Sequence, residues 1–412
     1  MKQKIYKRKR IIPVGWKEIK LGDVFRTSSG ATPLSTEKSY YEGGVIPWIN
    51  SGELASPYIY KTSNYITQKG FENSSTELYP KDTVLVAMYG ATAGKASLLK
   101  MEACTNQAIC AILPNEDYCP EFIKYNIDTL YEHLVGLSSG SARDNLSQAG
   151  LKELKLVLPK TKKEQEKLVS VLSLLDRKIE LNRQINDNLE AMAKQLYDYW
   201  FVQFDFPNEE GKPYKSSGGV MVWNEKLKRE IPQGWDFCFL ENLLTIRNGR
   251  DHKHLADGIY PVYGSGGEMR KVSEYLYDGE SVLMPRKGSL NNIMYVNEAF
   301  WTVDTMFYSE MKLSNCAKYI YYTIKDIDFT RWDSGTGVPS MTSSTLYSIK
   351  LVKPQSEILK KFDKMISPLF EHMKQISVQN AELIKQRDEL LPLLMNGQAT
   401  VNYHLSVMNA AV

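Results

Sequence analysis

The chain is poor in the residues that build disulfides and metal sites. Five cysteines and five histidines occur among 412 residues, and no two cysteines form a CxxC pair. An odd number of widely spaced cysteines argues against a disulfide framework or a zinc knuckle. His252 and His254 are close together, but no set of Asp, Glu or His with ligand spacing surrounds them. The sequence therefore predicts reduced thiols, mostly in the core, and no bound metal.

Long apolar runs and a strong net charge are also missing. No stretch of about 18 or more apolar residues occurs, which argues against a membrane-spanning helix. The basic first ten residues have no apolar segment behind them, unlike a secretory signal, so we expect a cytoplasmic protein without membrane contact. The formal net charge is +3 and much of it lies at the N-terminus, so a surface that binds nucleic acid must be local.

The motifs of the common enzyme classes are absent too. The chain has no Asn/Asp-Pro-Pro-Tyr tetrapeptide of the adenine methyltransferases, no nucleophile elbow, no kinase motif set and no HExxH. Residues 90–96, with the sequence GATAGKA, look like a phosphate-binding loop, but the spacing of the glycines is one residue short and Ala96 replaces the Ser or Thr that would bind magnesium. A turn between strands is the better interpretation. We expect no catalytic residues.

What the sequence does have is one long internal repeat. The opening IPVGW at 12–16 returns as IPQGW at 231–235, and the closing LKLVLP at 154–159 returns as IKLVKP at 349–354. Further matches in the same order pair 44–53 with 258–268, 78–85 with 276–283, and 139–147 with 334–342. Several matches in one order indicate a duplication.

After each closing proline, short β-like runs give way to a long apolar-striped stretch, roughly 161–201 and 356–396. The apolar residues recur at spacings of three and four, which is typical of helices that pair with each other. The alternative is that each helix docks on its own domain. The predicted seam positions are Leu168, Val171, Leu175, Lys178, Asn182, Ile185, Leu189, Met192, Leu196 and Tyr199 in the first helix, and Phe362, Ile366, Leu369, Met373, Ile376, Asn380, Leu383, Arg387, Leu390 and Leu394 in the second.

Local features refine this helix pair. Ser367 and Pro368 predict a kink or short break with Ser367 as an N-cap, and Gly397 predicts a C-terminus. The chain order favours an antiparallel pair, so Asn182 and Asn380, near the middle of each seam, should lie within one helical turn of each other. A buried Asn pair penalises slipped registers.

These patterns divide the chain into a first domain (1–159), a long helix (160–206), a turn-rich linker (207–230), a second domain (231–354) and a C-terminal helix with a tail (355–412). Polar, glycine-containing loops occupy equivalent places in both domains, and Arg, Lys, Asn and Ser on loops can bind base edges and phosphates. A solvated turn is an equally good interpretation of any one of these loops. The candidate DNA-binding residues are Thr27, Ser28, Lys95, Arg143, Asn145, Arg250, His252, Lys253, Arg286, Lys287, Asn291 and Arg331.

Over nearly its whole length the sequence resembles the specificity subunits of type I restriction–modification systems. The resemblance rests on the repeated Ile-Pro-x-Gly-Trp opening, the Ser-Gly-Ser/Thr loop with its Leu-Lys-Leu-Val strand, and the helix after it. It also rests on a central region that reads YWFVQFDFP at 199–207, GKPYKSSGG at 211–219 and MVW at 221–223. The resemblance implies a mixed α/β (α+β) fold with two target-recognition domains, separated by two long antiparallel helices and related by a pseudo-twofold axis.

The resemblance further implies that each domain reads one half of a bipartite site in double-stranded DNA. Two methylase subunits would clasp the helices and restriction subunits would join for cleavage, so S-adenosylmethionine, ATP and Mg would be bound by partners and the chain itself would need no cofactor. Recognition loops vary within the family, so no base-contacting residue carries over. The alternatives are the DNA-recognition subunit of a related, non-type I restriction system, a self-contained DNA-modifying enzyme, and a coiled-coil adaptor that binds no DNA.

Overall fold

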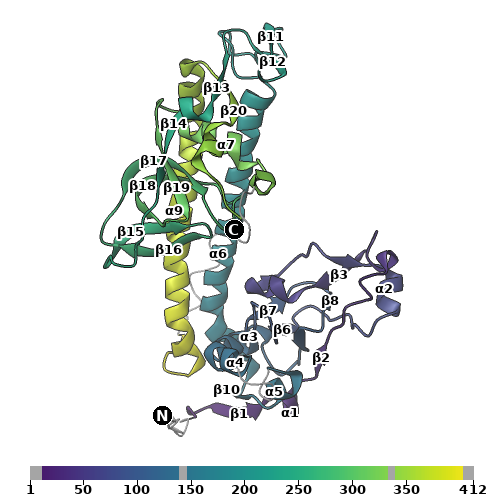
Figure 1. The fold of residues 1–412 in the computed structure, drawn as a ribbon. Helices are drawn as coiled ribbons and strands as arrows, with labels where there is room; N and C mark the ends of the chain where they lie inside the picture. The colour runs from purple at the N-terminus through teal and green to yellow at the C-terminus, as the bar shows by residue number, and fades with distance from the viewer. Residues whose placement is uncertain (1–11, 139–145, 333–338, 402–412) are drawn as a thin grey trace. The chain divides into compact units, whose positions relative to one another are not determined.

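The computed structural model describes residues 12–138, 146–332 and 339–401. The chain forms two compact units, residues 1–183 with 378–412 (unit 1) and residues 184–377 (unit 2), and each is described by itself. Each unit contains one copy of the repeat together with parts of the two long helices (Figure 1).

Unit 1 is built on a five-stranded sheet with the order β2-β9-β6-β7-β4. Its strands are β2 (Thr27–Ser29), β4 (Tyr58–Ile59), β6 (Val84–Ala87), β7 (Ala96–Leu99) and β9 (Ile109–Ile112). Every residue of β6, β7 and β9 is buried, because both faces of the sheet are covered. This explains why these strands have continuous apolar sequences rather than alternating ones.

Shorter elements surround this sheet. A three-stranded sheet joins β5 (Tyr65–Ile66), β3 (Ile46–Ile49) and β8 (Cys104–Thr105). β1 (Trp16–Lys20) pairs antiparallel with β10 (Lys155–Pro159), which brings the opening and closing motifs of the first repeat together. The helices are α1 (Leu21–Val24), η1 (Lys38–Tyr40), η2 (Ser51–Ala55), α2 (Gln68–Glu72), α3 (Pro120–Asp128), α4 (Tyr131–Ser138) and α5 (Gln148–Lys152).

Unit 2 contains a six-stranded sheet with the order β14-β19-β17-β18-β15-β16 (Figure 1). Its strands are β14 (Leu244–Asn248), β15 (Asp257–Gly264), β16 (Gly267–Val272), β17 (Tyr277–Pro285), β18 (Met294–Thr302) and β19 (Met306–Met311). β13 (Asp236–Phe239) pairs with β20 (Lys350–Lys353), as β1 pairs with β10. The helices are η4 (Leu240–Asn242), α7 (Ala317–Lys325), η5 (Phe329–Trp332) and α8 (Ser343–Tyr347). The stretch before the second repeat, expected to be a turn-rich linker, contains a hairpin of β11 (Met221–Asn224) and β12 (Arg229–Pro232).

The long helices are α6 (Lys162–Tyr197), continued by one π-helical turn, η3 (Asp198–Val202), and α9 (Ser356–Met395). The predicted short break at Ser367 and Pro368, with Ser367 as an N-cap, is wrong, since α9 runs through both residues, and the alternative of a kink stays a prediction. Packing outweighs the lost hydrogen bond of Pro368, because the side chain of Ile366 is fully buried in the unit 2 core. The predicted C-terminus is confirmed: Gly397 has a φ of 75° and donates its N–H to the carbonyl of Leu394.

The seam prediction succeeds on α9 and fails in part on α6. On α9, Ile376 is buried and Met373, Asn380 and Leu383 are half-buried. On α6, Asn182 is buried and Leu175 and Leu189 are half-buried, but four predicted seam residues are exposed, namely Lys178, Ile185, Met192 and Tyr199. The buried face of α6 is rotated towards Leu172, Asp176, Ile179, Ala193 and Tyr197. An apolar pattern cannot indicate this face, because it includes a buried carboxylate and an alanine.

Candidate nucleic-acid interface

Two candidate residues, Thr27 and Ser28, lie in strand β2 and not in a loop as expected. Ser28 is buried, and its hydroxyl donates to Glu77 Oε1 at 2.9 Å and accepts from the Tyr79 hydroxyl at 3.2 Å. Thr27 Oγ1 accepts from Gln148 Nε2 at 3.0 Å. The side chain of Ser28 therefore supports the domain from inside, and the exposed loop begins only after Gly30.

Lys95 is exposed but lies away from β2, because β9 and β6 separate β2 from β7 in the sheet. Its ammonium group lies 4.4 Å from the centre of the Tyr131 ring. Together with Lys124, Asp128 and Arg387 it lines a cavity of about 280 Å³ beside α9. The structure thus does not bring Lys95 together with Thr27 and Ser28. The candidates Arg143 and Asn145 lie outside the described residues.

A different set of residues gathers at one end of the unit 1 sheet. Four segments that follow or connect strands lie there, namely 30–32 after β2, 50–51 after β3, 88–92 after β6 and 106–108 between β8 and β9. The Asn106 N–H donates to the Ile49 carbonyl at 3.0 Å, and the Met88 N–H donates to the Ala108 carbonyl at 2.8 Å. We call these four segments the first edge.

Side chains tie the first edge together. Thr32 Oγ1 donates to Gln107 Oε1 at 2.5 Å, and the Tyr89 hydroxyl donates to the Gln107 carbonyl at 2.9 Å. Thr92 Oγ1 donates to the Ser51 carbonyl at 2.8 Å. Thr32, Tyr89 and Gln107 are exposed. Sequence reasoning missed Gln107, although its position in a turn between two buried strands was a usable signal.

Unit 2 builds the same arrangement from the second repeat. The corresponding segments are 249–250 after β14, 264–265 at the end of β15, 286–288 after β17 and 303–305 between β18 and β19. The Arg250 N–H donates to the Thr302 carbonyl, and the Arg286 N–H donates to the Thr305 carbonyl, each at 2.8 Å. We call these segments the second edge.

The second edge brings several predicted residues together. Arg250, Arg286 and Lys287 are exposed, and within the part of the chain that the structure describes none of them forms an ion pair with a carboxylate. Lys253 is exposed in the loop after Arg250, and His252 in that loop is half-buried. Cations that are exposed and unpaired are available to phosphates and to base edges.

Asn291 and Arg331 are joined to a neighbouring carboxylate. Asn291 Nδ2 donates to Asp328 Oδ1 at 3.2 Å, and Arg331 Nε lies 3.1 Å from Asp328 Oδ2. The next residue, Asn292, donates from Nδ2 to the Ser265 carbonyl at 2.8 Å and so links this group to the second edge. Among the candidates of unit 2, Asn291 and Arg331 therefore bind a carboxylate, whereas no ion pair within the described residues holds Arg250, Arg286 or Lys287, and the Arg286 guanidinium lies 6.0 Å from the centre of the Phe307 ring.

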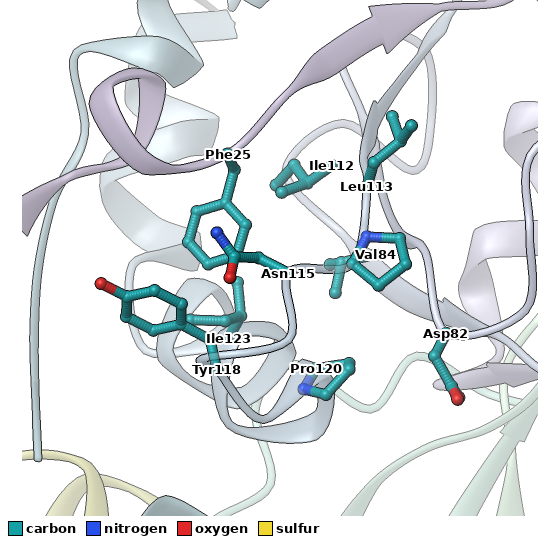
Figure 2. A pocket seen from close by; sticks show the side chains of 10 residues that line it. Phe25, Asp82, Val84, Ile112, Leu113, Asn115, Tyr118, Pro120 and Ile123 are labelled. Atoms are coloured by element: carbon teal, nitrogen blue, oxygen red, sulfur yellow. The ribbon is translucent and has the colours of Figure 1, made fainter. Parts of the chain in front are cut away.

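The pocket beside Phe25 in unit 1 is too small to hold a substrate molecule. Figure 2 shows a pocket lined by apolar side chains such as Phe25, Val84 and Ile112, and its volume of about 10 Å³ holds about one water molecule. No group of three or more His, Cys, Asp or Glu residues in the described part could hold a metal ion. Burial raises the pKa of the Cys110 thiol to about 12, which disfavours the reactive thiolate. None of the helices in the described residues is both long and apolar enough to cross a membrane.

Comparison with known proteins decides the family. Residues 13–191 and 232–380 each match the family described as the type I restriction modification DNA specificity domain. The two matches cover most of the chain and begin within the two Ile-Pro-x-Gly-Trp openings. The chain belongs to the type I DNA specificity family. The duplication seen in the sequence is therefore the pair of specificity domains, and the predicted membership is confirmed.

Similar proteins share this organisation along their full length. The chain is 29% identical to the type I restriction enzyme MjaIX specificity subunit of Methanocaldococcus jannaschii, over 95% of each chain. It is 22% identical to the EcoprrI specificity subunit of Escherichia coli, over 87% of this chain and 90% of that protein. The crystal structure of the type I system S subunit from M. genitalium, 19% identical, matches 94% of this chain and 97% of that chain with a TM-score of 0.57. That likeness confirms the mixed α/β fold class.

Proposed function

We propose that this type I specificity subunit reads a bipartite site in double-stranded DNA, with one half read by each unit, and that it directs methylase and restriction subunits to that site in the cytoplasm. The observation that carries the proposal is the repetition of the edge. In both units four corresponding segments meet at one end of the sheet, and equivalent backbone hydrogen bonds connect them. Two copies of one reading surface suit a site with two separate halves.

The charges of the second edge support contact with DNA. Arg250, Arg286 and Lys287 form no ion pairs within the described residues, while Arg247 and Arg270 elsewhere in the unit are paired with Glu310 and Asp257. Phosphates dominate the affinity of proteins for DNA, and unpaired cations contribute to it without first breaking an ion pair. The modest net charge of the chain is consistent with such a local surface.

Exposed apolar side chains on α6 support the assignment of the methylase to the helices. Leu174 and Leu181 are seven residues apart and 54% and 47% exposed, and Ile185 and Met192 are seven residues apart and 40% and 56% exposed. Residues seven apart lie on one helical face, so Leu174 and Leu181 form an apolar stripe on the part of α6 that belongs to unit 1. An exposed apolar stripe of this kind marks a protein-binding surface. We assign it to the methylase, two copies of which would bind, and we assign S-adenosylmethionine, ATP and Mg to the methylase and restriction subunits.

The stripe can be tested without touching either edge. Changing Leu174 and Leu181 together to Glu should abolish methylation by the methylase partner, because two carboxylates would be buried in the contact. Binding of the purified subunit to its DNA site should stay unchanged. Asp187→Lys, at an exposed position of α6 six residues after Leu181 and so on another helical face, is the control. Full methylation by the doubly substituted protein would contradict the assignment.

Activity of the purified chain tests the proposal as a whole. We expect no methylation or cleavage of DNA by the subunit alone, and methylation of one bipartite motif when its methylase partner and S-adenosylmethionine are added. Methyl transfer by the pure chain would make it a self-contained enzyme. Failure to retain DNA at low salt would make it an adaptor that binds no DNA.

A further inference from the structure

The first and second edges share one turn whose backbone is the same in both units. In unit 1 the Asn106 N–H donates to the Ile49 carbonyl at 3.0 Å, and the Ile109 N–H closes the turn on the Asn106 carbonyl at 3.3 Å. In unit 2 the Val303 N–H donates to the Tyr263 carbonyl at 3.0 Å, and the Met306 N–H closes the turn on the Val303 carbonyl at 2.9 Å. In each turn the residue that follows Asn106 or Val303 is exposed.

These two equivalent residues are Gln107 in unit 1 and Asp304 in unit 2. The strand residues next to each turn are buried on both sides, namely Cys104 and Thr105 with Ile109 in unit 1 and Trp301 and Thr302 with Met306 in unit 2. Their chemistry differs, since an amide both donates and accepts hydrogen bonds whereas a carboxylate only accepts them. The same position in the two repeats thus presents two different hydrogen-bonding patterns.

Gln107 is held in a defined orientation by two other segments of the first edge. The Thr32 hydroxyl donates to Gln107 Oε1 at 2.5 Å, and the Tyr89 hydroxyl donates to the Gln107 carbonyl at 2.9 Å. The first bond orients the amide, because it places the oxygen against the hydroxyl donor. One lone pair of Oε1 and both N–H groups of Nε2 are left for a ligand, and Nε2 has no partner among the described residues.

This free set matches one base. In the major groove adenine presents the N6 amino group as a donor beside N7 as an acceptor, and a glutamine amide binds both at once. Because Thr32 already orients the amide of Gln107, while Tyr89 binds its main-chain carbonyl, less side-chain entropy is lost when the amide binds a base. The geometry of the first edge therefore favours an A·T pair.

The second edge has the complementary pattern for a G·C pair. Asp304 lies between the backbone segments of Arg250 and Arg286, whose N–H groups bind the carbonyls of Thr302 and Thr305 on either side of it. A carboxylate accepts a hydrogen bond from the N4 amino group of cytosine, and an arginine binds O6 and N7 of guanine. The two cations also offset the repulsion between the Asp304 carboxylate and the DNA phosphates.

We propose that Gln107 and Asp304 are equivalent base-reading residues, with Gln107 reading an A·T pair in one half-site and Asp304, beside Arg250 and Arg286, reading a G·C pair in the other. The proposal rests on the proposed function, because it needs each unit to face its own half-site. It adds which position of each recognition domain reads a base, and which base pair that position selects.

The test uses the full-length subunit with its methylase partner and compares the methylated motif of each variant by sequencing of methylated DNA. Gln107→Glu keeps the shape of the side chain but removes both amide N–H donors. We expect the preference of this variant for A·T at one position of one half-site to fall by roughly 5- to 150-fold in relative methylation. The variant should instead favour a base pair with cytosine at that position, because a carboxylate accepts a hydrogen bond from the cytosine amino group. Thr32→Val, which removes only the hydroxyl that orients Gln107, should weaken the preference at the same base pair.

In unit 2, Asp304→Asn should relax one G·C pair, and the affected pair should lie in the other half-site. Gln68→Ala and Asp278→Asn are the matched controls. Both controls lie at strand ends far from the two edges. Gln68 follows β5, which pairs with the start of β3, whereas the first edge follows the end of β3. Asp278 lies at the start of β17, whereas Arg286 follows its end. Neither control should alter the motif.

The outcomes separate this proposal from the proposed function. Wild-type motifs for both Gln107→Glu and Asp304→Asn, beside a normal bipartite motif for the unsubstituted subunit, would overturn the base-reading assignment alone. A loss of methylation that is equal for all sequences would also overturn it, because it would show contact with the backbone and not with a base. If the unsubstituted subunit with its methylase yielded no bipartite motif at all, the proposed function itself would fail.

Discussion

Asn182 and Asn380 bind each other amide to amide between the two long helices of unit 1, with Asn182 Nδ2 donating to Asn380 Oδ1 at 2.8 Å. Asn182 is 1% exposed and also donates to Gln379 Oε1 at 2.7 Å. Farther along the same helices, Asp176 meets Arg387, so residue numbers rise on α6 as they fall on α9 and the pair is antiparallel. The meeting of the two asparagines within one helical turn is as the sequence predicts.

The asparagine pair should stabilise one register more than it stabilises the fold. Asn182→Leu alone should lower the free energy of unfolding by about 1–3 kcal/mol, because Asn380 and Gln379 lose a buried partner. Asn182→Leu combined with Asn380→Leu should recover much of that loss, since two leucines pack without an unsatisfied amide. Urea unfolding of the two single variants and the double variant measures the coupling between the two residues. Additive effects would show that the two amides do not act as a pair.

The length of the helix pair should set the spacer between the half-sites. Inserting four residues near Asn182 adds roughly one turn, or ~6 Å of rise, to α6. We expect the methylated motif to gain one or more unread base pairs while both half-sites keep their sequences. Four residues inserted in the exposed turn between β11 and β12 serve as the control and should leave the spacer unchanged. An unaltered spacer in the α6 variant would mean that the helix does not measure the site.

A buried carboxylate should be a major source of stability in unit 1. The Asp176 side chain is fully buried, 3.1 Å from Arg387 Nη1 and 3.9 Å from Lys124 Nζ, and it accepts a hydrogen bond from the Tyr125 hydroxyl at 2.6 Å. Asp176→Asn should destabilise the protein by about 1–3 kcal/mol, because it removes a buried charge-assisted contact with Arg387, while Asp388 still pairs with Arg387 and Asp128 with Lys124. Thermal unfolding monitored by circular dichroism checks this. Glu166→Gln, at an exposed position of the same helix, should change stability by less than about 0.5 kcal/mol.

The free cations of the second edge should contribute to DNA affinity in one of two measurable ways. Changing Arg286 and Lys287 together to Ala should weaken binding by about 1–3 kcal/mol for each contact to a base, and only for the cognate sequence. A phosphate contact would instead lower affinity for all sequences and reduce the dependence of binding on salt. Titrations of cognate and unrelated duplexes at several salt concentrations distinguish the two. Unchanged binding in both would return these residues to a solvated loop.

The duplication, the two long helices and their bounds could be predicted from the sequence because each depends on a pattern that local residues determine. The buried face of α6 could not, since it includes Asp176, whose burial depends on Arg387 and Lys124 from distant parts of unit 1. Ser28 was misjudged for a similar reason. Its neighbours suggest a polar loop, but pairing with β9 and a bond to Glu77 place it inside.

Some residues of the candidate site could likewise be predicted from the sequence and others could not. Arg250, Arg286 and Lys287 were identifiable because each lies in a polar loop that follows an apolar run. For Gln107 the sequence offered only its position in a turn between two apolar strands, because its contacts with Thr32 and Tyr89 arise only through the order of the strands. Once the turn of unit 1 is compared with that of unit 2, the equivalence of Gln107 and Asp304 becomes visible.

Exchange of one recognition domain tests the central claim most directly. Residues 231–354 would be replaced by the corresponding domain of a related specificity subunit, and the methylated motif would be determined in cells that also contain the methylase. We predict that one half-site changes to that of the donor, while the other half-site and its sequence stay as they were. A motif in which both halves change together, or neither changes, would contradict the claim that each unit reads its own half of the DNA site.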